Sequence, residues 1–263
     1  MSEREKVAQQ YSTNANLRAR IAFHDRFSRT TVSYPHWIFD GYAFGDDADV
    51  LEVGCGDANI WRENLDRIPP GWRLTLTDFS PGMVEAARAV LADRAEYAVA
   101  DVQELPFPDA SFDAAIANHM LFHVEDRPRA LSEIARVLRP GGTFRATTIG
   151  LDHCRELREI VPPPPESQWA KTRERFTIEQ VEDELAPFFV DVEIEPVPGP
   201  QELHVTELEP LLDFVRSRGD VEEEELEPLR RAYEAEVAER GFFQVSRASA
   251  RVRARLPASA RKA

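Results

Sequence analysis

The sequence is poor in cysteine and lacks long apolar runs. Its 263 residues contain two cysteines, Cys55 and Cys154, which are too few for a disulfide framework. No apolar run approaches the roughly 18–20 residues that span a bilayer. The first residues, Met1–Lys6, are charged, and no apolar signal core follows them. These absences predict a soluble cytoplasmic protein without a disulfide scaffold or a transmembrane helix.

Positive charge is also scarce. The chain has 32 Lys and Arg against 47 Asp and Glu, which gives a formal net charge of −15. Nucleic-acid binding depends mainly on neutralisation of phosphates by Lys and Arg, so this balance argues against a DNA or RNA partner. The same charge would be repelled by an anionic membrane surface. We therefore expect neither nucleic acid nor a membrane as a partner. We also expect the chain to act as a monomer or homodimer.

The apolar content of 43% is sufficient for a substantial core, and two helices are expected before it. Leu17, Ile21 and Phe27 share one face of a helix over about 14–28. Tyr34-Pro35 opens a second, aromatic helix, because proline suits the first turn. These aromatic side chains can pack against the domain that follows, or they can form a cap over a pocket with Tyr11 and Trp37 as contributors. Both can hold, and we predict an N-terminal helical cap over residues 1–45.

Strands and helices then alternate from Val50 to about Ile149. Ser80 as an N-cap followed by Pro81 is a strong helix-start signal. Alternation with short loops indicates a parallel sheet with right-handed crossovers, so the fold class is α/β. The expected strands are Val50–Val53, Arg73–Thr77, Tyr97–Ala100, Phe112–Asn118 and Thr143–Ile149. The expected helices are Ala58–Asp66, Ser80–Leu91 and Arg129–Leu138.

After Gly150 the pattern is looser. Helices are expected over Asp152–Ile160, Phe176–Ala186, Leu208–Arg218 and Glu222–Gly241, and strands over Val190–Val197 and Phe242–Ala254. In the last strand Arg251, Arg253 and Arg255 share one face. We interpret this as an exposed face that counters acidic neighbours, with an anionic substrate as the alternative.

Polar residues follow four successive strands of the expected sheet. Glu52 and Gly54–Gly56 stand at the end of the first strand, Asp78 ends the second, and Asp101 follows the third. Asn118-His119 ends the fourth strand. In doubly wound sheets, ligands bind beyond the carboxyl ends of the strands, so these residues are expected to meet in one crevice.

The two aspartates suit an adenosine ligand. A carboxylate at Asp78 can accept two hydrogen bonds from a ribose diol. Asp101 can accept a hydrogen bond from the exocyclic amine of adenine, while the backbone N–H of Val102 can donate one to the adenine ring. Either aspartate could instead be a helix cap or a turn residue. Their joint spacing favours the ligand-binding interpretation.

The turn after the first strand is unsuited to a pyrophosphate. The dinucleotide fingerprint requires a third glycine, and Asn59 occupies that position. Glu52 beside the turn would repel a pyrophosphate but favours a ligand with an ammonium group. S-adenosylmethionine is such a ligand. A protein that binds it is therefore favoured over the alternative, a nicotinamide-dependent oxidoreductase.

Four stretches resemble the motifs of class I S-adenosylmethionine-dependent methyltransferases of the type-11 group. They are Leu51–Gly56, Thr77–Met83, Asp101–Phe107 with Ser111–Asp113, and Val137–Gly142. The resemblance covers residues 49–149. The family usually has a glycine two or three positions after the first motif, and this sequence has Asp57-Ala58-Asn59 there instead. Residues after 150 are similar to the variable part of the family, which shapes the acceptor site.

The resemblance implies a specific fold and division of the chain. We expect a Rossmann-like, doubly wound, mostly parallel seven-stranded sheet with its last strand antiparallel, together with an N-terminal helical cap and inserted lid elements. The methyltransferase domain would span 46–263, with core motifs over 49–149 and the acceptor-shaping region and final strands over 150–256.

The resemblance also assigns residues to S-adenosyl-L-methionine and its product S-adenosyl-L-homocysteine. The methionyl portion would be held by Glu52, Gly54, Cys55, Gly56 and the neighbouring Asn59. The ribose would be held by Asp78. Phe79 and Met83 would offer an adenine face, and Asp101 and Val102 would contact its edge. Asn118 and His119 would lie beneath the reacting methyl group, and Tyr11 would close over the donor.

The implied reaction is an in-line methyl transfer to an oxygen, nitrogen or carbon nucleophile. If the acceptor must lose a proton, His119 and His123 are the candidate bases, although His123 can equally be structural. Trp37, Phe122 and Trp169 are expected to bind a small natural-product-like or metabolic acceptor. His153-Cys154 is too sparse for a metal site. A module that binds S-adenosylmethionine without turnover is the alternative function.

Overall fold

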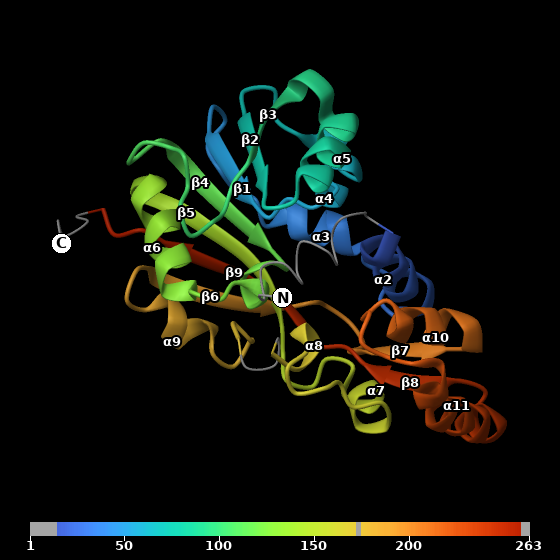
Figure 1. Cartoon of the computed structure of the whole chain (residues 1–263). Coiled ribbons are helices and arrows are strands. Elements are labelled where there is room, and N and C mark those ends of the chain that lie inside the picture. The colour runs from blue at the N-terminus through green and yellow to red at the C-terminus, as the bar shows by residue number, and fades with distance from the viewer. Residues whose placement is uncertain (1–14, 172–174, 259–263) are drawn as a thin grey trace.

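The computed structural model describes residues 15–171 and 175–258, and its centre is a seven-stranded sheet with the order β3-β2-β1-β4-β5-β9-β6 (Figure 1). β1 to β5 are parallel to one another, and β9 is antiparallel to both β5 and β6. The predicted mostly parallel sheet with an antiparallel last strand is confirmed. Its strands are β1 (Asp49–Val53), β2 (Arg73–Asp78), β3 (Ala95–Val99), β4 (Phe112–Asn118), β5 (Leu138–Ile149), β6 (Val190–Pro196) and β9 (Ser249–Arg255).

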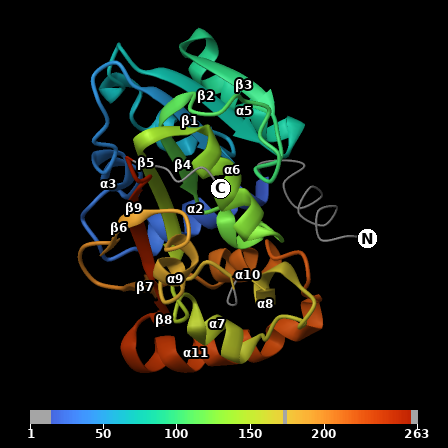
Figure 2. The same ribbon diagram turned by 90° about the vertical axis from the view of Figure 1, so that its left-hand side faces the viewer.

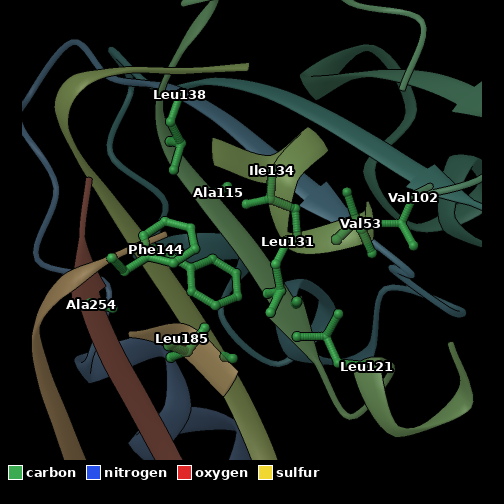
Figure 3. Close-up of a cluster of buried hydrophobic side chains, with 14 of the residues drawn as sticks. Val53, Val102, Ala115, Leu121, Leu131, Ile134, Leu138, Phe144, Leu185 and Ala254 are labelled. Atoms are coloured by element: carbon green, nitrogen blue, oxygen red, sulfur yellow. The ribbon is translucent and has the colours of Figure 1, made fainter. Parts of the chain in front are cut away.

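Helices cover both faces of this sheet. One face carries α3 (Tyr34–Asp40), α4 (Asn59–Arg62) and α5 (Pro81–Leu91), and the other carries α6 (Arg127–Val137) and α9 (Val181–Leu185). Side chains alternate between the two faces along a strand. Val50 therefore packs on the face that carries α3, α4 and α5, and Leu51 packs on the face that carries α6 and α9. Figure 3 shows Leu131 of α6 and Leu185 of α9 on the same side of the sheet as Phe144 of β5.

A second, smaller unit lies beyond the sheet. β7 (Glu202–Val205) pairs with β8 (Phe243–Ser246), and their apolar faces share a core with α2 (Ala15–Phe27), α7 (Arg155–Ile160), α10 (Leu208–Arg216) and α11 (Glu227–Arg240). Figures 1 and 2 both show α7, α10, α11 and this strand pair grouped together. The short α8 (Gln168–Lys171) and the 3-10 segments η1 (Leu65–Arg67), η2 (Ala92–Arg94), η3 (Leu121–His123) and η5 (Glu223–Leu226) complete the described elements.

The predicted single strand over Phe242–Ala254 is wrong in one respect, because the chain divides it between two sheets. β8 pairs with β7, whereas β9 enters the main sheet between β5 and β6. An alternating pattern reports which side chains share a face and gives no information about the partner strand. The apolar side chains change phase across Arg247-Ala248, from Phe243 and Val245 in β8 to Ala250, Val252 and Ala254 in β9, and the prediction overlooked this mark of the break. β7 was not predicted.

The two N-terminal helices join different cores. α2 packs with α10 and β7, while α3 packs against α4 and supplies Trp37 and Phe39 to the main core. This confirms packing for the aromatic side chains of α3. A boundary at residue 45 stays a proposal. Within 15–171 and 175–258, every helix is too short or too polar to cross a lipid bilayer.

The arginines of β9 pair with acidic side chains on β6, as the favoured interpretation predicted. Arg251 Nη2 lies 2.6 Å from Glu195 Oε2, Arg255 lies 3.5 Å from Asp191, and Arg253 pairs with Glu193. These pairs lie on the outer surface of β9 and the edge strand β6, so their charges are already balanced there.

Candidate functional site

A cavity of about 390 Å³ opens where the strand order reverses between β1 and β4. Its wall on the sheet side comes from the carboxyl ends of β1, β2 and β4 and the segment after β3. The opposite wall comes from α2, α8, α10 and the residues between β8 and β9. The sheet and the second unit therefore enclose one shared cavity, and most predicted site residues line it.

The turn after β1 brings backbone close to the cavity. Gly54 has φ +65° and Gly56 has φ +54°, and a Cβ at Gly54 would lie 2.7 Å from the Met120 side chain. The backbone N–H of Cys55 donates to the Thr77 carbonyl at 2.9 Å. Both the left-handed conformation and the close approach require glycine at position 54. The turn is therefore fixed against the end of β2.

Asp78 is held in place by two backbone N–H groups. Gly56 N donates to Asp78 Oδ2 at 2.9 Å, and Ser80 N donates to Asp78 Oδ1 at 2.8 Å. Ser80 also caps α5 by accepting from the backbone N–H of Met83. Burial raises the pKa of Asp78, while these backbone hydrogen bonds oppose the rise. The carboxylate is thus pre-positioned on the cavity wall at the first turn of a helix.

Glu52 is almost completely buried, with 2% of its surface exposed. Its carboxyl accepts from the indole N–H of Trp61 and from Asn118 Nδ2, the latter at 2.9 Å. Asn118 Nδ2 also donates to the Tyr42 hydroxyl at 2.6 Å. Burial raises the pKa of Glu52 to about 7. The structure therefore brings the predicted pair Glu52 and Asn118 into direct contact. Sequence reasoning missed their further partners, which are Trp61 on α4 and Tyr42 after α3.

The remaining predicted donor residues line the same wall. Asp101 accepts from the backbone N–H of Gln103 at 2.9 Å, and Val102 is buried beside it. Phe79 is 39% exposed and Met83 is buried on α5, and both line the cavity. Asn59 begins α4 and also lines the cavity. Tyr11 lies outside the described residues.

His119 occupies a strained position directly after β4. Its φ is +51°, and its backbone N–H is directed at the carbonyl and hydroxyl oxygens of Thr147, each at 3.1 Å. Its Nε2 lies 2.5 Å from the hydroxyl of Tyr34. Burial lowers the pKa of His119 to about 4 and raises the pKa of Tyr34 to about 12. At neutral pH the pair is therefore a neutral imidazole hydrogen-bonded to a neutral phenol.

His123 lies one turn further along, at the end of η3. Its ring contacts Phe122 edge to face with centroids 4.6 Å apart. Burial lowers the pKa of His123 to about 3, with a smaller contribution from Arg20. His123 also lines the cavity. Of the two predicted bases, His119 is the one whose ring nitrogen faces the Tyr34 hydroxyl.

Two of the three predicted acceptor-binding residues line the cavity. Phe122 stands beside His119, and Trp169 on α8 packs edge to face on Phe214 of α10, with centroids 5.9 Å apart. Trp37 does not line the cavity, because it packs behind Tyr34 with Arg251 over its other side. Tyr34, three residues earlier on the same helix, reaches the cavity in its place.

Sequence reasoning missed several residues that line the cavity. They are Tyr34, Asp25, Phe214, Arg247 and Ser249. Tyr34 was visible only as the opening residue of a helix. Arg247 was not singled out, because the predicted strand over Phe242–Ala254 ran through the break between β8 and β9 in which it lies.

One cluster could hold a metal ion among the residues that the structure describes. His24, His153 and Cys154 place ligand atoms within 4.8 Å of one another. The sequence had shown only the adjacent pair His153-Cys154. The positive charge of Arg247 contributes to the lowered pKa of both histidines after burial, so the surroundings disfavour an added cation. We assign no metal to this cluster.

Comparisons with known proteins point to one family. Residues 51–146 match the family model described as a methyltransferase domain. A malonyl-[acyl-carrier protein] O-methyltransferase of Serratia marcescens is 34% identical over 111 residues, which cover 41% of each chain. A ubiquinone/menaquinone biosynthesis C-methyltransferase of Hahella chejuensis is 34% identical over 100 residues, which cover 36% of this chain and 40% of that one. The chain thus spans about two fifths of the length of these relatives.

Solved structures share the fold. A Haemonchus contortus phosphoethanolamine N-methyltransferase 2 in complex with S-adenosyl-L-methionine superposes with a TM-score of 0.61 at 19% identity, covering 98% of this chain and 60% of that one. The [4+2]-cyclase SpnF superposes with a TM-score of 0.61 at 18% identity, covering 98% of this chain and 97% of that one. At these identities the likeness establishes the architecture alone.

Proposed function

We propose that the protein is a class I S-adenosylmethionine-dependent methyltransferase that acts on a small molecule, because residues 51–146 match the family model described as a methyltransferase domain. The observation that carries the proposal is the set of carboxylates around the glycine turn. Glu52, Asp78 and Asp101 come from the ends of successive strands and line one cavity. A ligand with an ammonium group, a ribose diol and an adenine amine complements all three.

The residues fit this cofactor better than a dinucleotide. A pyrophosphate bound at the glycine turn would stand beside the Glu52 carboxyl and the Asp78 carboxylate. Moreover, the backbone N–H of Gly56 in that turn already donates to Asp78. A Haemonchus contortus structure of the same architecture contains S-adenosyl-L-methionine.

Each predicted donor residue then has a defined task. The turn Gly54–Gly56 and Glu52 would hold the amino-acid end, with Asn59 beside them, and Asp78 the ribose hydroxyls. Phe79 and Met83 would enclose the adenine ring, and Asp101 and Val102 would meet its polar edge. When bound, S-adenosylmethionine supplies an activated methyl group, so alignment and exclusion of water can provide about 7–11 kcal/mol of the catalysis.

On the acceptor side, His119 is the candidate proton acceptor. Its imidazole is neutral at pH 7, and its Nε2 is fixed by the Tyr34 hydroxyl at 2.5 Å. An acceptor N–H or O–H that enters this position would exchange hydrogen bonds with the same two atoms. Phe122 and Trp169 would hold its apolar part. His123, with its more deeply lowered pKa, would pack rather than transfer a proton.

The acceptor atom is a finer question. The two curated relatives are named for different atoms, oxygen in one and carbon in the other. A small metabolic or natural-product-like acceptor suits a cavity of about 390 Å³ that must also receive the donor. Such an acceptor accords with a chain that works as a monomer or homodimer without nucleic acid.

The direct test is a methyl-transfer assay. The purified chain is incubated with S-adenosylmethionine carrying a radiolabelled methyl group and a panel of small phenols, acids and amines. We expect label in at least one acceptor and stoichiometric S-adenosylhomocysteine. Donor binding with no transfer to any acceptor class would instead favour the second candidate, a module that binds the donor without turnover. We retain this second candidate because the structurally similar [4+2]-cyclase has the same architecture but is named for a reaction other than methyl transfer.

A further inference from the structure

Arg247 is a buried cation on the acceptor side of the cavity. It lies between β8 and β9, is 5% exposed, and lines the cavity. Its Nη1 donates to the Ser28 hydroxyl at 2.9 Å, and its guanidinium carbon stands 4.9 Å from the ring centroid of Tyr34. The guanidinium is therefore adjacent to the Tyr34–His119 pair.

This guanidinium has no carboxylate partner among the residues that the structure describes. Asp25 lines the same cavity, and its negative charge opposes the lowering of the Arg247 pKa by burial, but no ion pair within 4.0 Å joins the two side chains. Arg20, which also lines the cavity, already donates to the hydroxyl and carbonyl oxygens of Ser217. Arg251 and Arg253 on the adjoining strand are both paired with glutamates.

Apart from Asp25, the groups around Arg247 are neutral or apolar. His24, His119 and His153 are neutral at pH 7, because burial lowers the pKa of each imidazole. The positive charge of Arg247 adds to this lowering. Phe214 and Trp169 supply apolar surface nearby. A buried charge in such surroundings is costly unless a counter-ion satisfies it.

We propose that the methyl acceptor bears a carboxylate, which Arg247 binds at the inner end of the cavity. This proposal rests on the proposed function and adds the chemical class of the acceptor. A single guanidinium balances one negative charge, and its planar N–H groups match a carboxylate in a two-point hydrogen bond. The one recorded side-chain acceptor, Ser28, leaves further N–H groups of the guanidinium for the ligand.

Matched acids and amides test the proposal. Benzoate and phenylacetate are titrated calorimetrically into the chain saturated with S-adenosylhomocysteine, alongside benzamide and phenylacetamide. We expect at least one acid to bind about tenfold or more tightly than its amide, which corresponds to about 1.4 kcal/mol. Phenyl phosphate serves as a dianionic arm. Its tighter binding than both acids would contradict the carboxylate assignment.

Three variants locate the effect. Arg247→Met should remove the preference for the acid, and Arg247→Lys should keep part of it, because the charge remains while the planar fork is lost. Arg253→Met removes the same charge from the outer face of β9 and should leave the preference unchanged. An equal affinity for acids and amides, no binding of either acid, or a preference that persists in Arg247→Met would overturn the proposal.

The titration also separates this inference from the function on which it rests. Failure of S-adenosylhomocysteine to bind would contradict the proposed cofactor. Binding of S-adenosylhomocysteine without discrimination between acids and amides would contradict the role of Arg247 alone.

Discussion

At the scale of single residues, the burial of Glu52 beside the Trp61 indole and the Asn118 amide should make the stability of the fold depend on pH. The pKa of this carboxyl rises from 4.5 to about 7 in the fold. The folded state therefore holds a proton that the unfolded chain releases between these two values. Accordingly, the free energy of unfolding should fall as pH rises through that window and level off above it.

The variant Glu52→Gln should remove this dependence. We expect the wild type to lose up to about 3 kcal/mol between pH 4.5 and pH 7 from this group, and the variant to lack that loss. Urea unfolding at closely spaced pH values measures it. S-adenosylhomocysteine should bind the wild type more tightly as Glu52 ionises, and the variant should show a flatter profile. Identical profiles for the two proteins would show that Glu52 does not titrate there.

His119 should matter for transfer and much less for donor binding. With an acceptor that must lose a proton, His119→Asn should lower kcat by about 10²–10⁴-fold, the range typical of general-base catalysis. The dissociation constant of S-adenosylhomocysteine should remain unchanged, since the donor-side carboxylates are intact. Single-turnover rates and calorimetry on the same preparation provide the two readouts. An unaltered rate would exclude His119 as the proton acceptor.

The cavity positions of the predicted donor residues were foreseeable from the sequence, whereas those of Tyr34 and Arg247 were not. Glu52 and Asp78 lie at the carboxyl ends of β1 and β2, and Asp101 follows β3, so their meeting place follows from the topology of a parallel sheet. Tyr34 and Arg247 meet through the packing of distant segments. Nothing in the local sequence of either residue encodes that contact.

At the scale of elements, α5 links the donor site to the stability of the fold. Ser80 caps the helix through the backbone N–H of Met83, directly after the aspartate that lines the cavity. The start signals of this helix were predicted from Ser80 and Pro81, and the structure confirms them. The cap therefore serves both helix stability and the placement of Asp78.

Loss of that cap should be measurable. Ser80→Ala should lower the free energy of unfolding by about 0.5–2 kcal/mol, because one N–H at the helix start loses its side-chain acceptor. Ser132→Ala at an exposed position of α6 is the matched control and should change stability by less than about 0.5 kcal/mol. Chemical denaturation of both variants checks the difference. Equal effects would show that the cap does not contribute.

The elements beyond β5 show where sequence patterns lose their predictive value. β1 to β5 were predicted from short segments bounded by turn residues. β8 and β9 were merged, although their apolar positions change phase between Val245 and Ala250 and their partners lie in different sheets. Pairing between strands distant in the chain is a tertiary choice, and side-chain periodicity does not record it.

At the scale of the whole molecule, two apolar cores meet around one cavity. The main sheet contributes the donor wall, and the unit formed by α2, α10 and the β7–β8 pair contributes the acceptor wall. Segments near both ends of the described chain, α2 and the residues that lead into β9, thus converge on the same site. This arrangement explains why the family match over residues 51–146 covers the donor residues and leaves Tyr34 and Arg247 outside it.

The central claim is that this cavity binds S-adenosylmethionine through the carboxylate at the end of β2. The most direct measurement is isothermal titration calorimetry of S-adenosylmethionine and S-adenosylhomocysteine against the wild type and Asp78→Ala, with circular dichroism to verify folding. We expect one site per wild-type chain and loss of binding in the folded variant. Absence of binding to the wild type, or an unchanged affinity in Asp78→Ala, would contradict the account.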